Sequence, residues 1–473
     1  MADLDEAAGF EFEPRMSDAD ALMWSIEKDP LLRSTITTVM VLDRAPDRDR
    51  LTRRMERVSR VVPRLRQRVL GHPMSIAPPR WAIDPNFDLS YHLRWMRATG
   101  DGSMREVFDI AHPIAMQGFD RARPLWEFVV VEGLADGSAA VIAKLHHSIT
   151  DGVGGVKLQM EMLDLERDPA IKPEDDLPAA PEAVALSETQ RWVDAVTYET
   201  KRQAEAAMST AGSAFGTLRR FTSDPVGVGV EALATVSSLG RLLRPSPEPL
   251  STIMTDRSLS VRFDSLQYPL GDMKAAAKVV SGKLNDSFVA GVAGGLRRYH
   301  LHHGARDVTS LRMSMPVNVR TESTATKAGN QFVPMRFSIP IAFDDPIEQM
   351  NAVRELVAKE RAEPALALSD PIANLVNRLP ATATTSLFGS MMRGVDFVTS
   401  NVPGAPITVY LAGAQMQAQI AMGPMAGAAT NITLVSYGDD VNIGINSDPA
   451  AIADPEVFLA CLKDSFEEIL KLA

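Results

Sequence analysis

Two adjacent histidines, His146 and His147, are followed by Asp151 and Gly152 in the stretch KLHHSITDGVGG. Histidine is scarce in this chain, at 8 of 473 residues, so a side-by-side pair points to chemistry. An imidazole has an ordinary pKa of about 6.5 and can take and return a proton at neutral pH. A positioned base of this kind can remove a proton from a hydroxyl while the oxygen attacks a carbonyl, typically with a rate gain of about 10²–10⁴.

The neighbours of the pair have plausible supporting roles. Alternation along the preceding strand predicts that His146 faces inward and that His147 points into a cleft. Asp151 is spaced to stabilise the turn, through its backbone or an arginine, or to orient the ring. Gly152 leaves room where backbone or substrate approaches closely. His147 is therefore the predicted general base, with His146, Asp151 and Gly152 as the rest of the catalytic set.

Other histidine chemistries fit the sequence less well. A metal site needs a third ligand nearby and a spacing such as His-Glu-x-x-His, and neither is present, so no metal is expected. A serine hydrolase usually carries Gly-x-Ser-x-Gly, which this chain lacks. A purely structural role is the default for a lone histidine, and here it is expected only for His146.

Composition limits the class of protein. The contents of 45% hydrophobic and 23% charged residues are typical of a globular protein. The net charge of −11 argues against a bulk nucleic-acid binder, which needs a positive surface. The single cysteine, Cys461, rules out an internal disulfide and a thiolate zinc site. Neither a secretory signal nor a membrane-spanning run is expected, so the prediction is a cytoplasmic protein that can touch a membrane surface.

The elements before the histidines alternate between strand and helix. Thr35–Asp43 is rich in β-branched residues and predicts a strand. Asp47 is a predicted cap for a helix with Leu51 and Met55 on its apolar face. Arginines recur from Arg44 to Arg68. They would either attract an anionic cofactor or lipid headgroups or form a solvated helix face, and the second interpretation is preferred.

The histidines themselves follow a predicted hairpin. Asp136-Gly137 is a strong turn signal between two apolar runs, and the second run, Ala139–Leu145, leads directly into them. After Gly155, Val156 and Met160 have helical spacing. The pair is thus expected at a strand end, in a loop that opens onto a helix.

The second half of the chain repeats this alternation. A proline- and acid-rich linker and a helix from Ser187 to Met208 separate it from the first half. Helices are then expected around 272–280, 285–303, 346–360 and 454–472, with strands around 259–263, 311–319 and 332–343, a strand that ends in a turn within 395–404, and a hairpin at 431–445. Asn285 or Asp286 is expected to cap the second of these helices. We therefore predict an α/β protein with domains at 1–165 and 256–473, joined by a helical crossover at 166–255.

The histidine motif and several other stretches resemble one known family. His-His-x-x-x-Asp-Gly matches the signature of the CoA-dependent acyltransferase superfamily. The surrounding motifs resemble those of the bacterial wax ester synthase/acyl-CoA:diacylglycerol acyltransferase family. They occur in order along nearly the whole chain: MSDADALMW from Met16, PLWE from Pro124, Asn285-Asp286, MPVNVR from Met315, GNQF from Gly329 and TSNVPGAP from Thr399. Asn318, where serine is commoner, and the inserted Ala405 depart from the pattern without touching the proposed base.

The resemblance implies two chloramphenicol-acetyltransferase-like domains with a tunnel at their interface, and it suggests roles for further residues. Asp151 would pair with an arginine and hold the loop, and Gly152 would keep the channel clear. Asn285 and Asp286 would support the site or simply cap a helix. Ser400 or Asn401 could donate a hydrogen bond to a tetrahedral oxyanion, although turn chemistry alone also explains them. Arg320 would meet CoA phosphate or pair with a carboxylate.

The function expected from the resemblance is transfer of a long-chain acyl group from acyl-CoA to diacylglycerol, making triacylglycerol, with transfer to long-chain alcohols, making wax esters, as a second activity. Acyl-CoA would be a co-substrate and no cofactor would be bound permanently. Since the acceptors are insoluble in water, peripheral contact with the inner face of the plasma membrane or with lipid droplets is expected. Acyl transfer to another hydroxyl or amine, and a catalytically idle acyl-CoA- or lipid-binding protein, are the alternatives.

Overall fold

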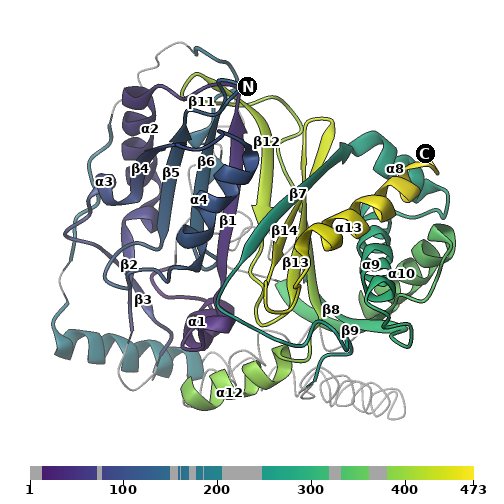
Figure 1. Ribbon diagram of the computed structural model, residues 1–473. Helices are drawn as coiled ribbons and strands as arrows, with labels where there is room; N and C mark the ends of the chain where they lie inside the picture. Colours follow the sequence, from purple (N-terminus) through teal and green to yellow (C-terminus); the bar gives the residue numbers. More distant parts are fainter. Residues whose placement is uncertain are drawn as a thin grey trace, which may run out of the picture.

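Two six-stranded sheets organise the computed structural model of the chain (Figure 1). The structure describes residues 13–71, 77–149, 158–159, 161–169, 177–184, 186–204, 248–318, 332–361 and 381–473. Both sheets contain parallel and antiparallel neighbours, and helices cover them. The predicted class, α/β with mixed sheets flanked by helices, is confirmed.

The first sheet carries the histidine pair. Its strand order is β11-β12-β1-β6-β5-β4. The bounds are β1 Thr35–Leu42, β4 Leu93–Arg97, β5 Trp126–Glu132, β6 Ala139–His146, β11 Tyr410–Leu411 and β12 Ala414–Met422. The predicted hairpin is confirmed as β5 and β6, which pair antiparallel around a turn where Gly137 has a φ of 80°. A positive φ is a conformation that favours glycine.

Two helices cover opposite faces of this sheet. They are α2 (Arg48–Val61) and α4 (Met104–Met116). Met40 of β1 packs in the cluster that contains α2, and its neighbour Val39 packs in the cluster that contains α4. Alternation along the strand separates these two apolar sets. The predicted cap is also confirmed, because the Asp47 side chain accepts a hydrogen bond from the backbone N–H of Arg50.

Shorter elements surround the first sheet. They are α1 (Asp18–Ile26), η2 (Pro30–Leu32), η3 (Pro63–Arg66), β2 (Gln67–Leu70), β3 (Arg80–Ile83) and α3 (Leu89–His92). Residues 188–204 form a helix, which places the predicted crossover helix within the described part of the chain. In Figure 1 this helix runs along the lower left edge of the molecule.

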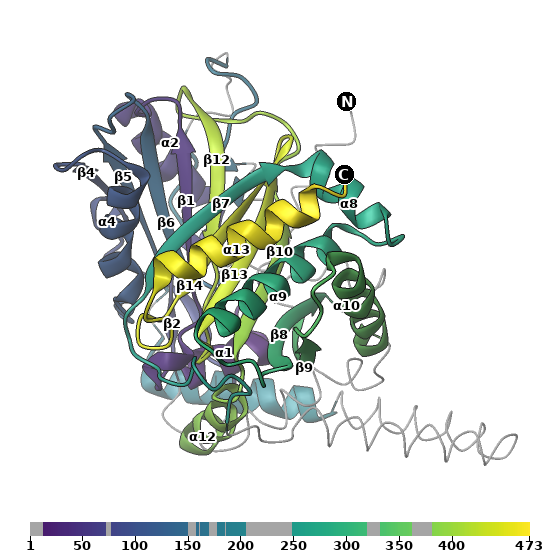
Figure 2. The same ribbon diagram turned by 45° about the vertical axis from the view of Figure 1, so that its right-hand side comes forward.

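The second sheet has the order β7-β14-β13-β10-β8-β9. Its strands are β7 Arg262–Pro269, β8 Ser310–Asn318, β9 Phe332–Pro340, β10 Phe397–Pro403, β13 Thr430–Tyr437 and β14 Asp440–Ser447. Its helices are α8 Leu270–Lys278, α9 Leu284–His302, α10 Pro346–Arg361, α12 Ala381–Met392 and α13 Pro455–Leu470. Figure 2 shows α13, α9 and α10 on one face of the sheet. Each strand and helix predicted in this half has its counterpart here, whereas α12, β11 and β12 were not predicted.

The two sheets meet where β12 and β14 cross. Although β12 lies late in the sequence, it pairs with β1 and so belongs to the first sheet. A Cβ atom on Gly444 of β14 would lie 2.1 Å from the carbonyl oxygen of Ala421 on β12, so only glycine fits this crossing. Residues Tyr410–Met422 therefore belong to the first sheet, although the sequence-based division placed them in the second domain, 256–473. The limits 1–165, 166–255 and 256–473 otherwise stay a prediction.

Candidate active site

His146 is the last residue of β6, and its side chain is fully buried. Its Nε2 lies 3.0 Å from Oε1 of Glu27, which directly follows α1. On the other side of the ring, Nδ1 accepts the backbone N–H of Ser148 at 3.1 Å and lies 2.6 Å from the Ser148 hydroxyl. The ring of Trp24 meets it edge-on, with centroids 5.6 Å apart. The expectation that His146 is the inward-facing, structural member of the pair agrees with this environment.

His147 begins the turn after β6 and keeps part of its surface exposed. Its backbone N–H donates to the carbonyl of Ser34 at 2.9 Å, which fixes the turn against the start of β1. Burial of the ring, together with the nearby charge of His146, lowers the pKa of His147 to about 4. At neutral pH this imidazole is uncharged and able to accept a proton.

After the histidines, the next residues that the structure describes are 158–159 and 161–169. Asp151 and Gly152 lie outside the described residues, and so does the start of the helix expected after Gly155. In this segment, Glu161 pairs with Arg57 of α2 at 2.5 Å. The carboxylate of Asp164 is held by two α2 arginines, Arg50 at 2.8 Å and Arg54 at 2.5 Å.

These contacts correct the preferred interpretation of the arginine-rich helix. Its arginines are not simply a solvated face, because several of them bind acidic side chains that come later in the chain. Arg66 and Arg60 in turn share the carboxylate of Glu56, each at 2.6 Å. The helix thus anchors the exit of the loop that contains the histidine motif. The charges of both partners are visible in the sequence, but nothing there indicated that they meet.

Asn285 and Asp286 lie in the first turn of α9. The residue at the N-cap position is Lys283, so the expected cap at Asn285 or Asp286 is displaced. Asp286 still contributes to the cap, because its carboxylate accepts the backbone N–H of Lys283 at 2.7 Å. The Asn285 amide lies 4.0 Å from the sulfur of Met315 on β8. Arg320, the third polar residue predicted on this side, lies outside the described residues.

Ser400 and Asn401 lie inside β10 rather than in a turn, which corrects the sequence-based expectation. Both pair in parallel register with β13, Ser400 opposite Thr433 and Asn401 opposite Leu434. Ser400 is partly buried and Asn401 is exposed. The Asn-Val-Pro-Gly sequence suggested a turn, but β10 continues to Pro403 because β13 pairs with it over its whole length.

A buried lysine near the histidines was not predicted from the sequence. Lys144, two residues before His146, is fully buried, and its Nζ lies 3.3 Å from Oε1 of Glu127. Arg94 contacts the other oxygen of the same carboxylate. Trp126, next to Glu127, is fully buried as expected, and its indole N–H donates to the carbonyl of Leu65. The Pro-Leu-Trp-Glu motif was the available signal for Glu127, whereas nothing pointed to Glu27.

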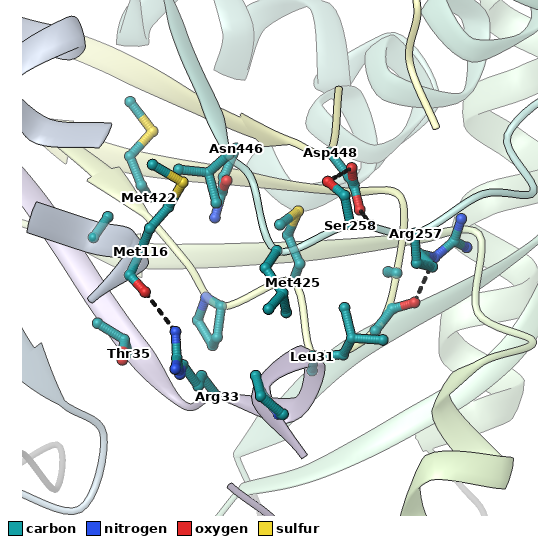
Figure 3. A pocket seen from close by; sticks show the side chains of 18 of the residues that line it. Leu31, Arg33, Thr35, Met116, Arg257, Ser258, Met422, Met425, Asn446 and Asp448 are labelled. Atoms are coloured by element: carbon teal, nitrogen blue, oxygen red, sulfur yellow. Dashed lines mark hydrogen bonds between the residues drawn. The ribbon is translucent and has the colours of Figure 1, made fainter. Parts of the chain in front are cut away.

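A pocket opens where the two sheets meet (Figure 3). Its lining includes Leu31, Arg33, Thr35, Met116, Met422 and Met425, and His147 is not among the described residues that line it. Arg33 donates to the carbonyl of Met116 at 2.5 Å. Thr35 pairs with His146 across β1 and β6, so these two side chains share a face of the sheet.

One buried side chain of the pocket is only partly hydrogen-bonded. Asn446 of β14 is 7% exposed, and its amide nitrogen donates to the carbonyl of Gly423. Its Oδ1 has no hydrogen-bond partner among the described residues. A buried acceptor of this kind favours a ligand that brings a donor. The described residues contain no cluster of three or more metal-ligating side chains and no helix long and apolar enough to cross a membrane.

Comparisons with known proteins agree with this fold. The family model described as the wax ester synthase/diacylglycerol acyltransferase catalytic domain matches residues 16–288, and the WS/DGAT C-terminal domain matches residues 328–470. A Mycobacterium tuberculosis protein named "putative diacylglycerol O-acyltransferase" is 36% identical over 464 residues, covering 97% of this chain and 93% of the relative.

Solved structures show the same architecture. A wax ester synthase/diacylglycerol acyltransferase from Marinobacter aquaeolei VT8 is 19% identical and has a TM-score of 0.63, covering 97% of this chain and 98% of that one. The first condensation domain of the calcium-dependent antibiotic synthetase is 18% identical and has a TM-score of 0.59, covering 98% and 97%. The likeness to both extends over nearly the whole chain.

Proposed function

The chain belongs to the wax ester synthase/diacylglycerol acyltransferase family and is an acyl-CoA-dependent acyltransferase, and we propose that His147 is its general base. The proposed acceptor is diacylglycerol, which gives triacylglycerol, with long-chain alcohols giving wax esters as a second activity. The observation that carries the proposal is a neutral imidazole at the end of β6, on a residue that keeps part of its surface exposed.

The proposed chemistry needs one base and no covalent intermediate on the enzyme. The imidazole of His147 accepts the proton of the acceptor hydroxyl while the oxygen attacks the thioester carbonyl. The tetrahedral intermediate then collapses, the carbon–sulfur bond breaks, and the CoA thiolate takes the proton from the imidazolium. A thiol with an ordinary pKa of about 8.5 is a better leaving group than the attacking alcohol, so the intermediate collapses towards the ester.

The remaining site residues have supporting roles in this proposal. Asp151 holds the loop and Gly152 keeps the channel open. Ser400 or Asn401 donates to the oxyanion, and such a donor is often worth about 3–4 kcal/mol at the transition state. Arg320 binds a CoA phosphate. These roles derive from the family resemblance.

Asn285 and Asp286 belong to the same proposal with a narrower role. Asp286 orders the start of α9 through its hydrogen bond to Lys283, and Asn285 lies beside it against Met315. The pair would support the side of the site that the second sheet and its helices form.

We assign the pocket between the sheets to one apolar substrate chain. Its methionines and leucine suit an aliphatic chain, since methionine adapts its shape to irregular apolar ligands. The free acceptor of Asn446 suits a hydroxyl on that chain, as in a partial glyceride. The pocket lies near the end of β6, since Thr35 in its lining pairs with His146.

The deciding experiment supplies purified protein with radiolabelled palmitoyl-CoA and either dioleoylglycerol or hexadecanol, and separates the lipids by thin-layer chromatography. Wild-type protein should form triacylglycerol, and His147→Ala should lose about 10²–10⁴ of the rate. The matched control is His302→Ala, because His302 is an exposed histidine on α9. Absence of both neutral lipids, or an unaffected His147→Ala variant, would refute the assignment. A preference for a small polar acceptor would replace the lipid acceptor.

The protein is also proposed to work at the cytoplasmic surface of the plasma membrane or of lipid droplets. The helix of 188–204 supports this location. One face docks on the body, since Ala195 is buried and Asp194 pairs with Arg80 at 2.9 Å. The other face exposes Val193 by 61% and Val196 by 45%. An amphipathic helix with an exposed apolar face suits an interfacial position.

A further inference from the structure

A buried carboxylate lies behind the histidine pair. The Glu27 side chain is only 11% exposed, and its Oε1 lies 3.0 Å from Nε2 of His146. The same oxygen accepts the backbone N–H of Ser34 at 2.7 Å. A carboxylate in such an interior position is tolerated because these partners replace water. Glu27 therefore joins the end of α1 to the end of β6 and the start of β1.

The hydrogen bonds of His146 define its tautomer. Nδ1 accepts the backbone N–H of Ser148 at 3.1 Å, and a nitrogen that accepts a hydrogen bond carries no hydrogen. In the neutral ring the hydrogen is therefore on Nε2, which faces Glu27. Burial by itself would raise the pKa of Glu27, but the interaction with His146, the hydrogen bond from Ser34 and the charge of Arg121 together outweigh burial, so the pKa lies below its ordinary value. The carboxylate is thus charged at neutral pH, and its Oε1 lies 3.0 Å from the nitrogen that carries the hydrogen.

The same carboxylate is also linked to His147. Ser34 donates its N–H to Glu27, and the Ser34 carbonyl accepts the backbone N–H of His147 at 2.9 Å. One branch of the network orients the ring of His146, and the other fixes the backbone of the next residue. Both branches end at Glu27, whose hydrogen bonds add to the β1–β6 pairing that sets the course of the chain at His147.

We propose that Glu27 is a positioning residue that, through His146 and Ser34, holds the imidazole of His147 in line with the reacting hydroxyl. The inference rests on the proposed role of His147 as the base. Glu27 touches neither substrate nor reacting atoms, so its contribution is geometric. A displacement of about 1 Å at a reacting group can lower a rate by about 100-fold.

The kinetic test compares substitutions at Glu27 with one on the same helix. Glu27→Gln keeps an acceptor oxygen in the same place and should retain kcat to within about fivefold. Glu27→Ala should lower kcat by about 100-fold while the KM for palmitoyl-CoA stays within about twofold. Asp20→Asn, which changes a buried α1 carboxylate bonded to Ser17, is the control and should leave kcat unchanged. A folded Glu27→Ala variant with wild-type kcat would overturn the proposal, and so would a Gln variant as impaired as Ala.

A second measurement does not depend on activity. In protein labelled with ¹⁵N-histidine, the His146 signal, assigned through its loss in His146→Gln, should show the Nε2–H tautomer. It should shift in Glu27→Gln and stay unchanged in Asp20→Asn. If Glu27→Ala does not fold, Glu27→Asp takes its place, because it withdraws the carboxylate by one methylene group. A wild-type Nδ1–H tautomer contradicts the positioning role even if acyl transfer is found, whereas missing acyl transfer with the expected spectrum refutes only the proposed function.

Discussion

The ammonium of Lys144 lies 3.3 Å from the carboxylate of Glu127, at a position where Lys144 exposes none of its surface. Burial lowers the pKa of Lys144, and the charge of Glu127 opposes this shift. Arg94 contacts the same carboxylate from a more exposed position. Because Lys144 is two residues before His146 on β6, this pair anchors the strand that presents the histidines.

Removing the acid should be more damaging than removing the lysine. Glu127→Gln leaves a buried ammonium without its counter-ion and should reduce the free energy of unfolding by about 3–5 kcal/mol. Lys144→Met should reduce it by less, since Arg94 still pairs with Glu127. Urea unfolding followed by circular dichroism measures both. Equal losses, or a larger loss for Lys144→Met, would contradict the pairing described here.

The depressed pKa of His147 predicts an unusual pH profile. With a pKa of about 4, the imidazole stays neutral down to mildly acidic pH, so kcat/KM should change little between pH 8 and pH 5.5. A base with the ordinary pKa of about 6.5 would lose about tenfold over the same interval. The measurement is kcat/KM against pH at fixed ionic strength, with circular dichroism as a check on folding. A fall centred near pH 6.5 would show that the ring is more solvated than in this structure.

His112 should make stability depend on pH. Burial and the charge of Arg105 lower its pKa to about 4, and its Nε2 accepts the backbone N–H of Phe263, which joins α4 to β7. Between pH 4 and pH 6.5 the unfolded chain binds this proton and the folded chain does not. The contribution of neutral His112 to the free energy of unfolding is therefore fully present above about pH 6.5. It is lost as the pH falls towards 4, by up to about 3 kcal/mol.

The test compares urea unfolding at pH 7.5 and pH 5 in wild type and His112→Asn. The variant should show a smaller difference between the two pH values. The control, His302→Asn, changes an exposed histidine and should keep the wild-type difference. Identical pH dependence in all three proteins would rule out His112 as a source of acid sensitivity.

Gly444 should tolerate no side chain at the crossing of the two sheets. Its added Cβ would meet the backbone oxygen of Ala421 at 2.1 Å, so Gly444→Ala must separate β14 from β12 and should cost about 1–3 kcal/mol. Gly271→Ala is the matched control, because nothing lies within 4 Å of its added Cβ. Gly271 is helical, so alanine there should be neutral or stabilise by about 0.5–1 kcal/mol. Thermal unfolding of both variants measures the difference between their effects on stability.

Membrane contact should depend on the exposed face of the 188–204 helix. Wild-type protein should float with anionic phospholipid vesicles, and the double substitution Val193→Ser/Val196→Ser should reduce the floating fraction. Val279→Ser/Ile407→Ser removes the same number of exposed apolar side chains elsewhere and should not reduce it. Wild-type protein that stays entirely in the soluble fraction would refute the proposed location.

Local patterns explain how much of the fold was predictable. The hairpin around Asp136-Gly137, the α2 cap at Asp47 and the helices of the second half follow from turn chemistry, capping and apolar spacing within short windows. The expected turn at Ser400 is wrong because pairing with β13 extends β10 through Pro403. Strand β12 was missed because its place beside β1 is set by a partner that lies far away in the sequence.

The sequence by itself determined the elements, the histidine pair at a strand end and the family motifs, because each is encoded by neighbouring residues. Only the tertiary structure decided that Glu27 meets His146, that Asp164 lies between Arg50 and Arg54, and that Lys144 is neutralised in the interior by Glu127. The residues next to a charged side chain in the sequence do not indicate which partner it will meet. The chain must fold before burial makes one particular counter-ion necessary.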